Sequence, residues 1–467
     1  MELKLETLYI DFHHTYRCRF GRRDTGIIEA MRILCFLGFC SIMSPGLFGQ
    51  QRKGLSLVNQ WKKLDYTYLT PAAREHAIFT GEFVPGNGVP IDMDVHYGAN
   101  SLTKIYVTIP RFQGGIPATL TTVSQKLLNG SSLLQPYPSW EWHRNSPSCN
   151  RDRLVSVFRT QIDECGRLWV LDTGKIGSNQ ICAAQIIAFD PNTDRVIHKF
   201  EIPKDQILPS SLLVTPVADV RDPQSGCRDT FIYAADITGF GLIVYDVRRN
   251  RSWRVQNKLF YPIPQYGTFT IAGESFDLMD GVLGMAISPN KPGQDRILYF
   301  HSLASNTENY VYTSVLRNET IFDENSDAEP RQFSVYSNTR PSQSAAEVID
   351  KNGIMYFGLL EEIAMACWNI NTDYAQRNFD VFDTNAETLQ FPSGMKIINN
   401  RKGKQELWVL TCRFQKVMTG TMNSEEINFR IQAASTDDIL NGSKCKATSA
   451  NAAGSTGGGY GLTARSG

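Results

Sequence analysis

Three polar residues near position 94 alternate along the chain in a pattern that suits acid–base or metal chemistry. Asp92, Asp94 and His96 are separated by single apolar residues. In a β-strand, residues two apart point to the same face, so the pattern places two carboxylates and an imidazole side by side. Such groups can transfer protons or ligate a metal ion. The alternative is a polar strand face that makes only structural hydrogen bonds.

A second set of residues suits an aromatic amine. Short apolar runs begin near Ser344 and Ser393, and loops that lead into such runs carry Glu274, Phe276 and Phe391. A ligand ring can stack on phenylalanine while its ammonium group pairs with the carboxylate. The alternative is that both phenylalanines only fill the core. The predicted ligand-binding residues are therefore Asp92, His96, Glu274, Phe276, Ser344, Phe391 and Ser393.

Motifs of the common catalytic and cofactor sites are missing from the sequence. The chain contains no G-x-S-x-G, no P-loop and no H-E-x-x-H. Its seven histidines are scattered, whereas a copper or zinc oxidase needs a denser histidine set. The sequence therefore predicts no metal and no cofactor. The 47 basic and 47 acidic side chains balance, which argues against a nucleic-acid partner.

The elements that must hold these residues form a repeat. An aliphatic residue followed by an aromatic one recurs in short apolar runs, with the aromatic residue at positions 106, 169, 233, 299, 356 and 408. The spacings are 63, 64, 66, 57 and 52 residues, which indicates a repeat architecture. We therefore predict an all-β fold, a six-bladed β-propeller with four-stranded antiparallel blades around a central channel. The alternative is two or three β-sandwiches.

The strands of two periods can be placed in detail. We expect strands at 154–163, 167–172, 185–190 and 195–202, and again at 214–222, 231–236, 242–247 and 252–255. The first strand of each period should line the channel. Six blades fit residues 90–432, and the apolar stretch 77–85 is predicted to supply a closing strand. Asp172 and Asp236 precede turns and are expected to cap them by accepting backbone N–H bonds.

The two ends of the chain differ from this body. Residues 31–49 start with Met31 and Arg32, continue as an apolar run to Met43 and finish in small residues, the pattern of a secretory signal peptide. A buried amphipathic helix is the alternative. Residues 1–30 would be an upstream extension, residues 50–446 a single propeller domain, and the glycine-rich residues 447–467 a flexible tail. We expect a secreted, extracellular protein with no membrane anchor.

Cysteines and sequons agree with secretion. Seven cysteines follow residue 49, and in a secreted chain they favour disulfides, with one thiol left over. Cys412 is the candidate free thiol because it follows an apolar strand. Asn129, Asn318 and Asn441 begin N-x-S/T triplets in polar stretches and are predicted glycosylation sites.

Several ordered stretches resemble the yellow and major royal jelly protein family of insects. They include RLWVLDTG at 167–174, GLIVYD at 241–246, GMAISP at 284–289 and ETLQFPSGMKI at 387–397. The likeness covers roughly residues 55–446 and implies a secreted six-bladed propeller. It also implies disulfide pairs, because royal jelly members resemble this chain at four of the cysteines but lack Cys165 and Cys227. The implied pairs are Cys165–Cys227, Cys149–Cys182 and Cys367–Cys445.

The resemblance leads to three functional hypotheses. The first is a non-enzymatic binder of small aromatic amines or catechol-like metabolites at the channel, linked to cuticle pigmentation or glandular secretion. The second is an enzyme of melanin synthesis that converts dopachrome by tautomerisation, with Asp92, His96 or Glu274 as the acid or base. The third is a nutritive secreted protein. The sequence leaves the oligomeric state open.

Overall fold

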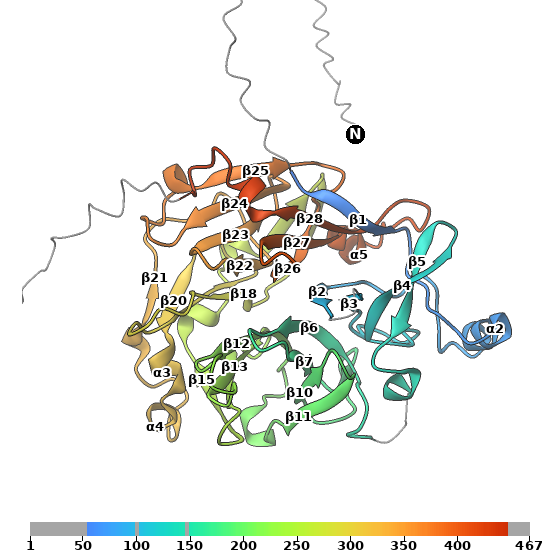
Figure 1. The fold of residues 1–467 in the computed structure, drawn as a ribbon, viewed down its shortest axis with the longest axis horizontal. Helices are drawn as coiled ribbons and strands as arrows, with labels where there is room; N and C mark the ends of the chain where they lie inside the picture. Colours follow the sequence, from blue (N-terminus) through green and yellow to red (C-terminus); the bar gives the residue numbers. More distant parts are fainter. Residues whose placement is uncertain (1–53, 99–101, 145–148, 447–467) are drawn as a thin grey trace, which may run out of the picture. The chain divides into compact units, whose positions relative to one another are not determined.

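The computed structural model describes residues 54–98, 102–144 and 149–446. The predicted leader and the glycine-rich tail lie outside these described residues, and no helix among the described residues is long and apolar enough to cross a membrane. Six four-stranded antiparallel sheets are arranged around a centre (Figure 1). The prediction of a six-bladed, all-β propeller is therefore confirmed.

Each blade is one four-stranded sheet whose first strand lies innermost. Blades 1 to 3 consist of β2 (Asp92–Tyr97), β3 (Thr103–Thr108), β4 (Leu120–Leu128), β5 (Ser131–Pro136); β6 (Val157–Ile162), β7 (Leu168–Asp172), β10 (Gln185–Asp190), β11 (Arg195–Glu201); and β12 (Leu213–Val220), β13 (Thr230–Asp236), β14 (Gly241–Asp246), β15 (Arg251–Gln256). Blades 4 to 6 consist of β18 (Val282–Ile287), β19 (Ile297–Ser302), β20 (Asn309–Tyr312), β21 (Phe333–Val335); β22 (Glu347–Ile349), β23 (Ile354–Leu359), β24 (Ala364–Asn369), β25 (Asp380–Thr384); and β26 (Pro392–Asn399), β27 (Gln405–Cys412), β28 (Phe429–Ser435), β1 (Ser56–Trp61).

Short elements decorate the loops between these strands. Two small hairpins pair β8 (Lys175–Ile176) with β9 (Asn179–Gln180) and β16 (Thr268–Ile271) with β17 (Glu274–Asp277). The α-helices are α2 (Pro71–Phe79), α3 (Thr313–Arg317), α4 (Glu319–Phe322), α5 (Phe414–Thr419) and α6 (Thr436–Ile439). The 3₁₀ turns are η1 (Trp140–His143), η2 (Lys204–Gln206), η3 (Lys258–Phe260), η4 (Pro264–Tyr266), η5 (Pro330–Gln332) and η6 (Gln376–Asn378).

The strand that closes the ring is β1, which pairs antiparallel with β28 as the outermost strand of blade 6. The prediction that residues 77–85 supply this strand is wrong. Residues 77–79 end helix α2, and residues 80–85 follow it. The helix forms because Pro71 is pre-organised for a first helical turn and the Thr70 hydroxyl accepts the Ala73 N–H at 3.1 Å. Joining the two ends of the chain within one sheet removes an open edge from the propeller.

The repeated aromatic residues all lie on the second strand of their blade and are buried. Trp169, Tyr233 and Tyr356 have essentially no exposed surface, and Trp408 is 6% exposed. A large side chain at this place fills the wedge between neighbouring blades, so its recurrence in the sequence marks one blade each time.

Asp172 and Asp236 do more than cap their turns. Asp172 accepts the Gly174 N–H at 3.1 Å, as a turn cap does, and also the N–H groups of Val155 and Ser156 at 2.9 and 2.7 Å. Asp236 likewise accepts Gly239 N–H and Leu212 N–H. Both carboxylates therefore tie the second strand of a blade to the segment that enters its inner strand.

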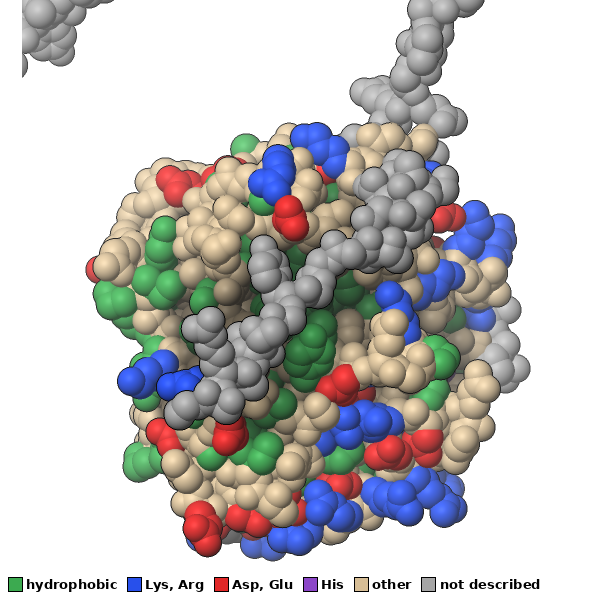
Figure 2. Space-filling model, turned by 90° about the vertical axis from the view of Figure 1, so that its left-hand side faces the viewer, with side chains coloured by type: hydrophobic (Ala, Val, Ile, Leu, Met, Phe, Trp, Pro, Cys, Tyr) green, Lys and Arg blue, Asp and Glu red, His purple; other side chains and the backbone are tan. Residues whose placement is uncertain are grey.

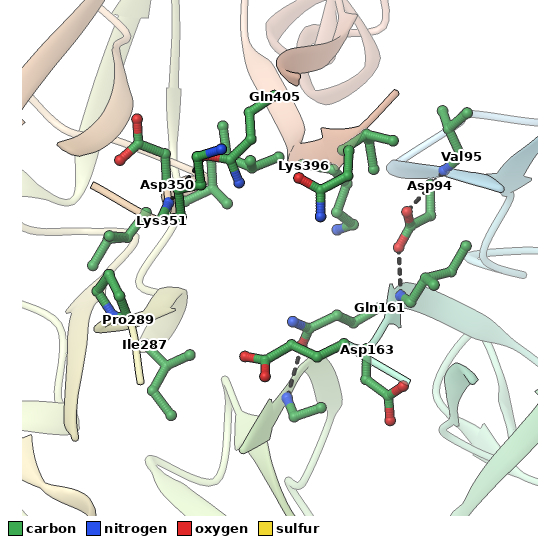
Figure 3. A pocket seen from close by; sticks show the side chains of 18 of the residues that line it. Asp94, Val95, Gln161, Asp163, Ile287, Pro289, Asp350, Lys351, Lys396 and Gln405 are labelled. Carbon is green, nitrogen blue, oxygen red and sulfur yellow. Dashed lines mark hydrogen bonds between the residues drawn. The ribbon is translucent and has the colours of Figure 1, made fainter. Parts of the chain in front are cut away.

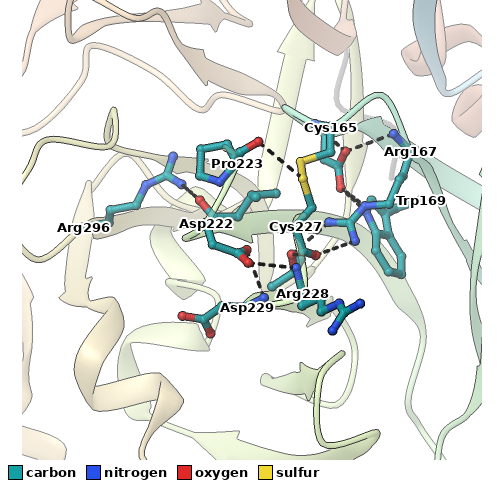
Figure 4. Close-up of a disulfide and its surroundings, with 12 residues drawn as sticks. Cys165, Arg167, Trp169, Asp222, Pro223, Cys227, Arg228, Asp229 and Arg296 are labelled. Carbon is teal, nitrogen blue, oxygen red and sulfur yellow. Dashed lines mark hydrogen bonds and ion pairs between the residues drawn. A yellow bond between two sulfur atoms is a disulfide. The ribbon is translucent and has the colours of Figure 1, made fainter. Parts of the chain in front are cut away.

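Three disulfides cross-link the described residues, and the pairs are those that the family resemblance implies: Cys149–Cys182, Cys165–Cys227 and Cys367–Cys445. Cys165–Cys227 joins the first turn of blade 2 to a loop of blade 3 (Figure 4). Beside it, Arg167 pairs with Asp163 and donates to the Cys227 carbonyl at 2.8 Å. Cys412 is a free thiol, as predicted, and it is fully buried.

The surface carries both signs of charge. On the face that Figure 2 shows, basic and acidic side chains lie interspersed among the described residues and no single sign dominates. The balanced formal charge of the chain thus corresponds to a mixed surface on this face.

We expect the double variant C165S/C227S to unfold at a lower urea concentration than the wild type. The bond closes a loop with a sequence separation of 62 residues, and losing such a cross-link costs about 2–5 kcal/mol. The unfolding midpoint followed by tryptophan fluorescence measures the loss. Cys412→Ala removes a buried sulfur but no cross-link and should shift the midpoint less. Equal midpoints for the double variant and the wild type would contradict the prediction.

Candidate functional site

Six inner strands surround the channel, and their ends define its two mouths. β2, β6, β12, β18, β22 and β26 contact one another in a closed ring. The carboxyl-terminal ends of all six strands line one cavity of about 540 Å³ (Figure 3). This volume is in the range of small-molecule sites. We call this cavity the polar mouth, because charged and amide side chains from five of the six blades point into it or lie at its wall.

Asp94 is the most perturbed acid of the polar mouth. Its two carboxylate oxygens accept the N–H groups of Val95 at 2.8 Å and of Ile162 at 2.7 Å. Burial raises the pKa of Asp94 to about 7, and Asp92 adds to this rise, although Lys396 and the two N–H donors oppose it. Asp94 can therefore exchange a proton near neutral pH.

His96 and Gln161 each use one side-chain atom in a hydrogen bond within the protein, and the other polar group of each side chain stays available. His96 Nε2 lies 3.0 Å from Asn192 Oδ1 and donates to it, which leaves Nδ1 as an acceptor. Gln161 Oε1 accepts the Ala218 N–H at 2.7 Å, so its amide NH₂ remains a donor at the cavity (Figure 3). The polar mouth thus offers an acceptor, a donor and a titrating acid.

Asp92 lies deeper in the channel than Asp94, and its carboxylate binds mainly Lys396. Both Asp92 oxygens accept from Lys396 Nζ, at 2.9 and 2.7 Å, and one also accepts the Thr160 N–H at 3.0 Å. Asp92 has no exposed surface, whereas Lys396 lines the polar mouth. The sequence placed Asp92 correctly on one face with Asp94 and His96, but its carboxylate is held in an ion pair. Below this pair the channel continues as a small cavity of about 90 Å³ that Arg159 and Glu347 help to line.

The opposite mouth is aromatic. Phe391 precedes the inner strand β26, and its ring lies 4.9 Å from that of Phe414, which also contacts Phe276 at 6.2 Å. Phe276 stacks on Phe269 at 5.1 Å, and both Phe276 and Phe391 are buried. We call these rings, with the half-exposed Phe112 that contacts Phe414, the aromatic mouth.

Glu274 belongs to the aromatic mouth. Its carboxylate accepts the hydroxyl groups of Thr419 and Thr421, and Lys416 lies 3.8 Å away. These hydroxyl bonds, followed by the Lys416 charge, lower the pKa of Glu274. The hairpin β16–β17 and helix α5 hold these groups together.

The residues predicted as one ligand site are therefore divided along the channel. His96 lies at the polar mouth, and Glu274, Phe276 and Phe391 lie at the aromatic mouth. Asp92, Ser344 and Ser393 are buried in the wall between. Sequence reasoning missed Gln161 and Lys396. The signal that could have found them is their place on the first strand of a period, at the same end as His96.

Comparisons with known proteins agree with the sequence motifs. The family model described as major royal jelly protein matches residues 155–445. The chain belongs to the yellow and major royal jelly protein family. Its relatives include the dopaminechrome tautomerase of Drosophila melanogaster, 33% identical over 85% of this chain and 85% of the relative. Major royal jelly protein 9 of Apis mellifera is 34% identical over 83% and 89% of the two chains.

A third relative carries the family's other name. Protein yellow of Drosophila yakuba is 32% identical over 82% of this chain and 69% of the relative. The family match includes Gln161 and Lys396 of the polar mouth and both Glu274 and Phe391 of the aromatic mouth. Asp92, Asp94 and His96 precede the matched residues.

We expect Asp94 to destabilise the fold as the pH rises. Its folded-state pKa of about 7 lies above the ordinary value of 3.8, so its stabilising contribution is complete below about pH 4 and is lost as the pH rises through 7. The wild type should lose stability relative to Asp94→Asn over this window, as measured by urea midpoints at pH 4.5, 6 and 8.

Asp190→Asn is the matched comparison of opposite sign. The Thr193 hydroxyl and the Asn192 N–H lower the pKa of Asp190, so its contribution is present at neutral pH and is lost on acidification. A stability difference between wild type and Asp94→Asn that stays constant across the window would refute the assignment to Asp94.

Proposed function

We propose that this protein is an extracellular tautomerase that converts an aminochrome, an indoline quinone formed from a catecholamine, at the polar mouth. The observation that carries the proposal is Asp94, a buried carboxyl that titrates near neutral pH in a cavity of about 540 Å³. A perturbed acid in a cleft is a physical signature of acid–base chemistry. The relative that bears the name dopaminechrome tautomerase supports the choice of substrate class.

The reaction needs a base, and Asp94 is suited to that role. Tautomerisation of an aminochrome to a dihydroxyindole breaks one C–H bond at each of two carbons of the five-membered ring and places the two protons on the two quinone oxygens, so substrate and product are isomers and no oxidant is consumed. The Asp94 carboxylate takes a carbon-bound proton. Its raised pKa makes it a stronger base than an ordinary carboxylate.

Neighbouring groups can hold the quinone as charge develops on oxygen. The Lys396 ammonium and the Gln161 amide NH₂ are donors on the cavity wall and stabilise that oxygen. His96 Nδ1 is left to accept the ligand's N–H. Solvent protonates the quinone oxygens and takes the abstracted proton back from Asp94, which restores the carboxylate, and Lys396 stays bound to Asp92 throughout.

Binding of an aromatic amine without catalysis is the second candidate, and it is located at the aromatic mouth. The observation in its favour is the Glu274 carboxylate beside stacked phenylalanine rings, which is the arrangement expected for an ammonium group attached to a ring. Calorimetry with dopamine and serotonin on wild type and Glu274→Gln tests this candidate. Heat that disappears in Glu274→Gln but persists in Asp94→Asn assigns the amine to the aromatic mouth.

We predict that Asp94→Asn lowers kcat/KM for dopaminechrome by about 10²–10⁴, the usual contribution of a general base. In the wild type, kcat/KM should rise with pH and level off above about 7, because only ionised Asp94 accepts the proton. The loss of dopaminechrome colour in a stopped-flow spectrometer measures both effects.

The matched control is Asp172→Asn. Asp172 is equally buried and also accepts backbone N–H bonds, but it does not line the polar mouth. Its activity per folded molecule should equal that of the wild type. Wild-type rates in Asp94→Asn, or a wild-type enzyme with no activity on the aminochrome, would reject the proposal.

The expected secretion predicts that the three N-x-S/T sites on the surface carry glycans. Asn129, Asn318 and Asn441 are all exposed, and Asn129 lies in the turn between β4 and β5. Expression in insect cells should give a secreted protein whose mobility on a gel increases after enzymatic deglycosylation. Each single Asn→Gln variant should remove one step of that shift. A shift that survives all three substitutions would place the glycans elsewhere.

A further inference from the structure

A buried cluster of ionisable groups lies at the seam between blades 4 and 5, apart from both mouths. His301 is on β19, Glu308 follows β19, and Glu347 begins the inner strand β22. His301 and Glu308 have no exposed surface, and Glu347 is 5% exposed. Burying two carboxylates so close together is costly unless a positive charge compensates them.

The hydrogen bonds of His301 fix where its proton lies. Nε2 is 3.1 Å from the Ser344 carbonyl oxygen, which can only accept, so Nε2 carries a hydrogen. In the neutral ring, Nδ1 then presents a lone pair. That lone pair faces one oxygen of Glu308 at 3.2 Å and one of Glu347 at 3.1 Å. Three electron-rich atoms therefore converge on one point, which requires a hydrogen or a metal cation between them.

Arg340 contacts only one of the two carboxylates. Its guanidinium contacts Glu308 at 2.5 Å and donates to the Tyr374 hydroxyl at 3.2 Å. Glu347 has no such arginine contact, and apart from His301 neither of its oxygens has a hydrogen-bond partner among the described residues. The Ser344 hydroxyl beside the cluster is likewise buried and unpartnered in this part of the chain.

We propose that His301, Glu308 and Glu347 form a binding site for one divalent transition-metal ion, such as Zn²⁺ or Mn²⁺. One imidazole nitrogen and two carboxylate oxygens are a common donor set for these ions. The three donor atoms lie within 4.8 Å of one another. Ligands at about 2.0–2.2 Å from one metal lie roughly 3.0–3.5 Å apart, which agrees with the separations from Nδ1.

The surroundings of the cluster have the features of a metal site. A histidine that binds a metal usually donates its other ring N–H to a carbonyl or carboxylate, as His301 donates to Ser344. Glu347 also lines the small cavity of about 90 Å³ inside the channel, so one residue of the cluster borders the channel. The site goes beyond the proposed tautomerase, because no residue of it lines the polar mouth.

A proton is the competing cation. An imidazolium ring would donate from Nδ1 to both carboxylates and would neutralise the cluster together with Arg340. Burial and Arg340 act to lower the pKa of His301, but Glu347 and Glu308 outweigh them and raise it. The two cations differ in what they predict for metal content, so the experiment can separate them.

The test is the metal content of the secreted, full-length protein purified without chelators. Plasma mass spectrometry should find about one equivalent of a transition metal in the wild type and less than a tenth of that in His301→Gln and Glu347→Gln. His198→Gln changes a histidine that stacks on Trp169 in blade 2 and should keep the full equivalent.

A second measurement does not depend on the variants folding. Wild-type protein produced in medium with Co²⁺ should show visible d–d absorption bands, and 1,10-phenanthroline should lower its melting temperature. Wild-type protein without metal after growth in Zn²⁺, Mn²⁺ or Co²⁺ would overturn the proposal and leave the imidazolium. Full metal content in His301→Gln would overturn it as well. The aminochrome assay is a separate readout, so failure of the tautomerase proposal leaves this result intact.

Discussion

The inner edges of the six blades impose the constraint on which the rest of this molecule depends. Each inner strand has a partner strand on one side only, so the backbone groups on its other edge face the channel or the next blade. Buried N–H and C=O groups need partners. In this protein side chains from neighbouring blades supply them. Asp92 and Asp94 accept N–H groups of β6, Gln161 accepts one of β12, and Thr215 donates to the Leu283 carbonyl.

This constraint explains why structural and chemical roles fall on the same side chains. A carboxylate that must accept backbone N–H bonds in a buried seam loses its contact with water, and its pKa rises unless a cation compensates it. Lys396 compensates Asp92 directly and Asp94 only from a distance. Asp94 is therefore left titrating near neutral pH at the edge of a cavity. The same arrangement that closes the ring creates a base, and the fold bears the cost in stability at neutral pH.

A feature of this structure could be predicted from the sequence where it depends on neighbouring residues, and not where it depends on how distant strands meet. The buried aromatic residue of each second strand recurs with the blade, so six copies predicted six blades. The alternation of Asp92, Asp94 and His96 predicted their shared face, because the period of a strand is local. Which end of a strand lies at which mouth of the channel depends on the whole fold and not on neighbouring residues. Without it, His96 and Phe391 were predicted as one site, although they lie at opposite mouths. The closing strand was misplaced because the Thr70 cap and Pro71 in the first turn start a helix that outweighs the apolar composition of residues 77–85.

Between blades 4 and 5 the inner strand is short, and a different contact replaces the side-chain bonds to backbone N–H groups that join the other blades. β22 has three residues and contacts the inner strand β18, and the seam with blade 4 also includes His301 of the second strand, which donates to the Ser344 carbonyl just before β22. Glu347, the first residue of β22, meets a histidine and a second carboxylate instead of a backbone N–H. Two acids and a lone pair cannot close a seam by themselves, because they repel one another. A cation at this point joins residues of two blades as the aspartates do elsewhere, so the requirement for ring closure, rather than catalysis, is sufficient reason for the cluster to exist.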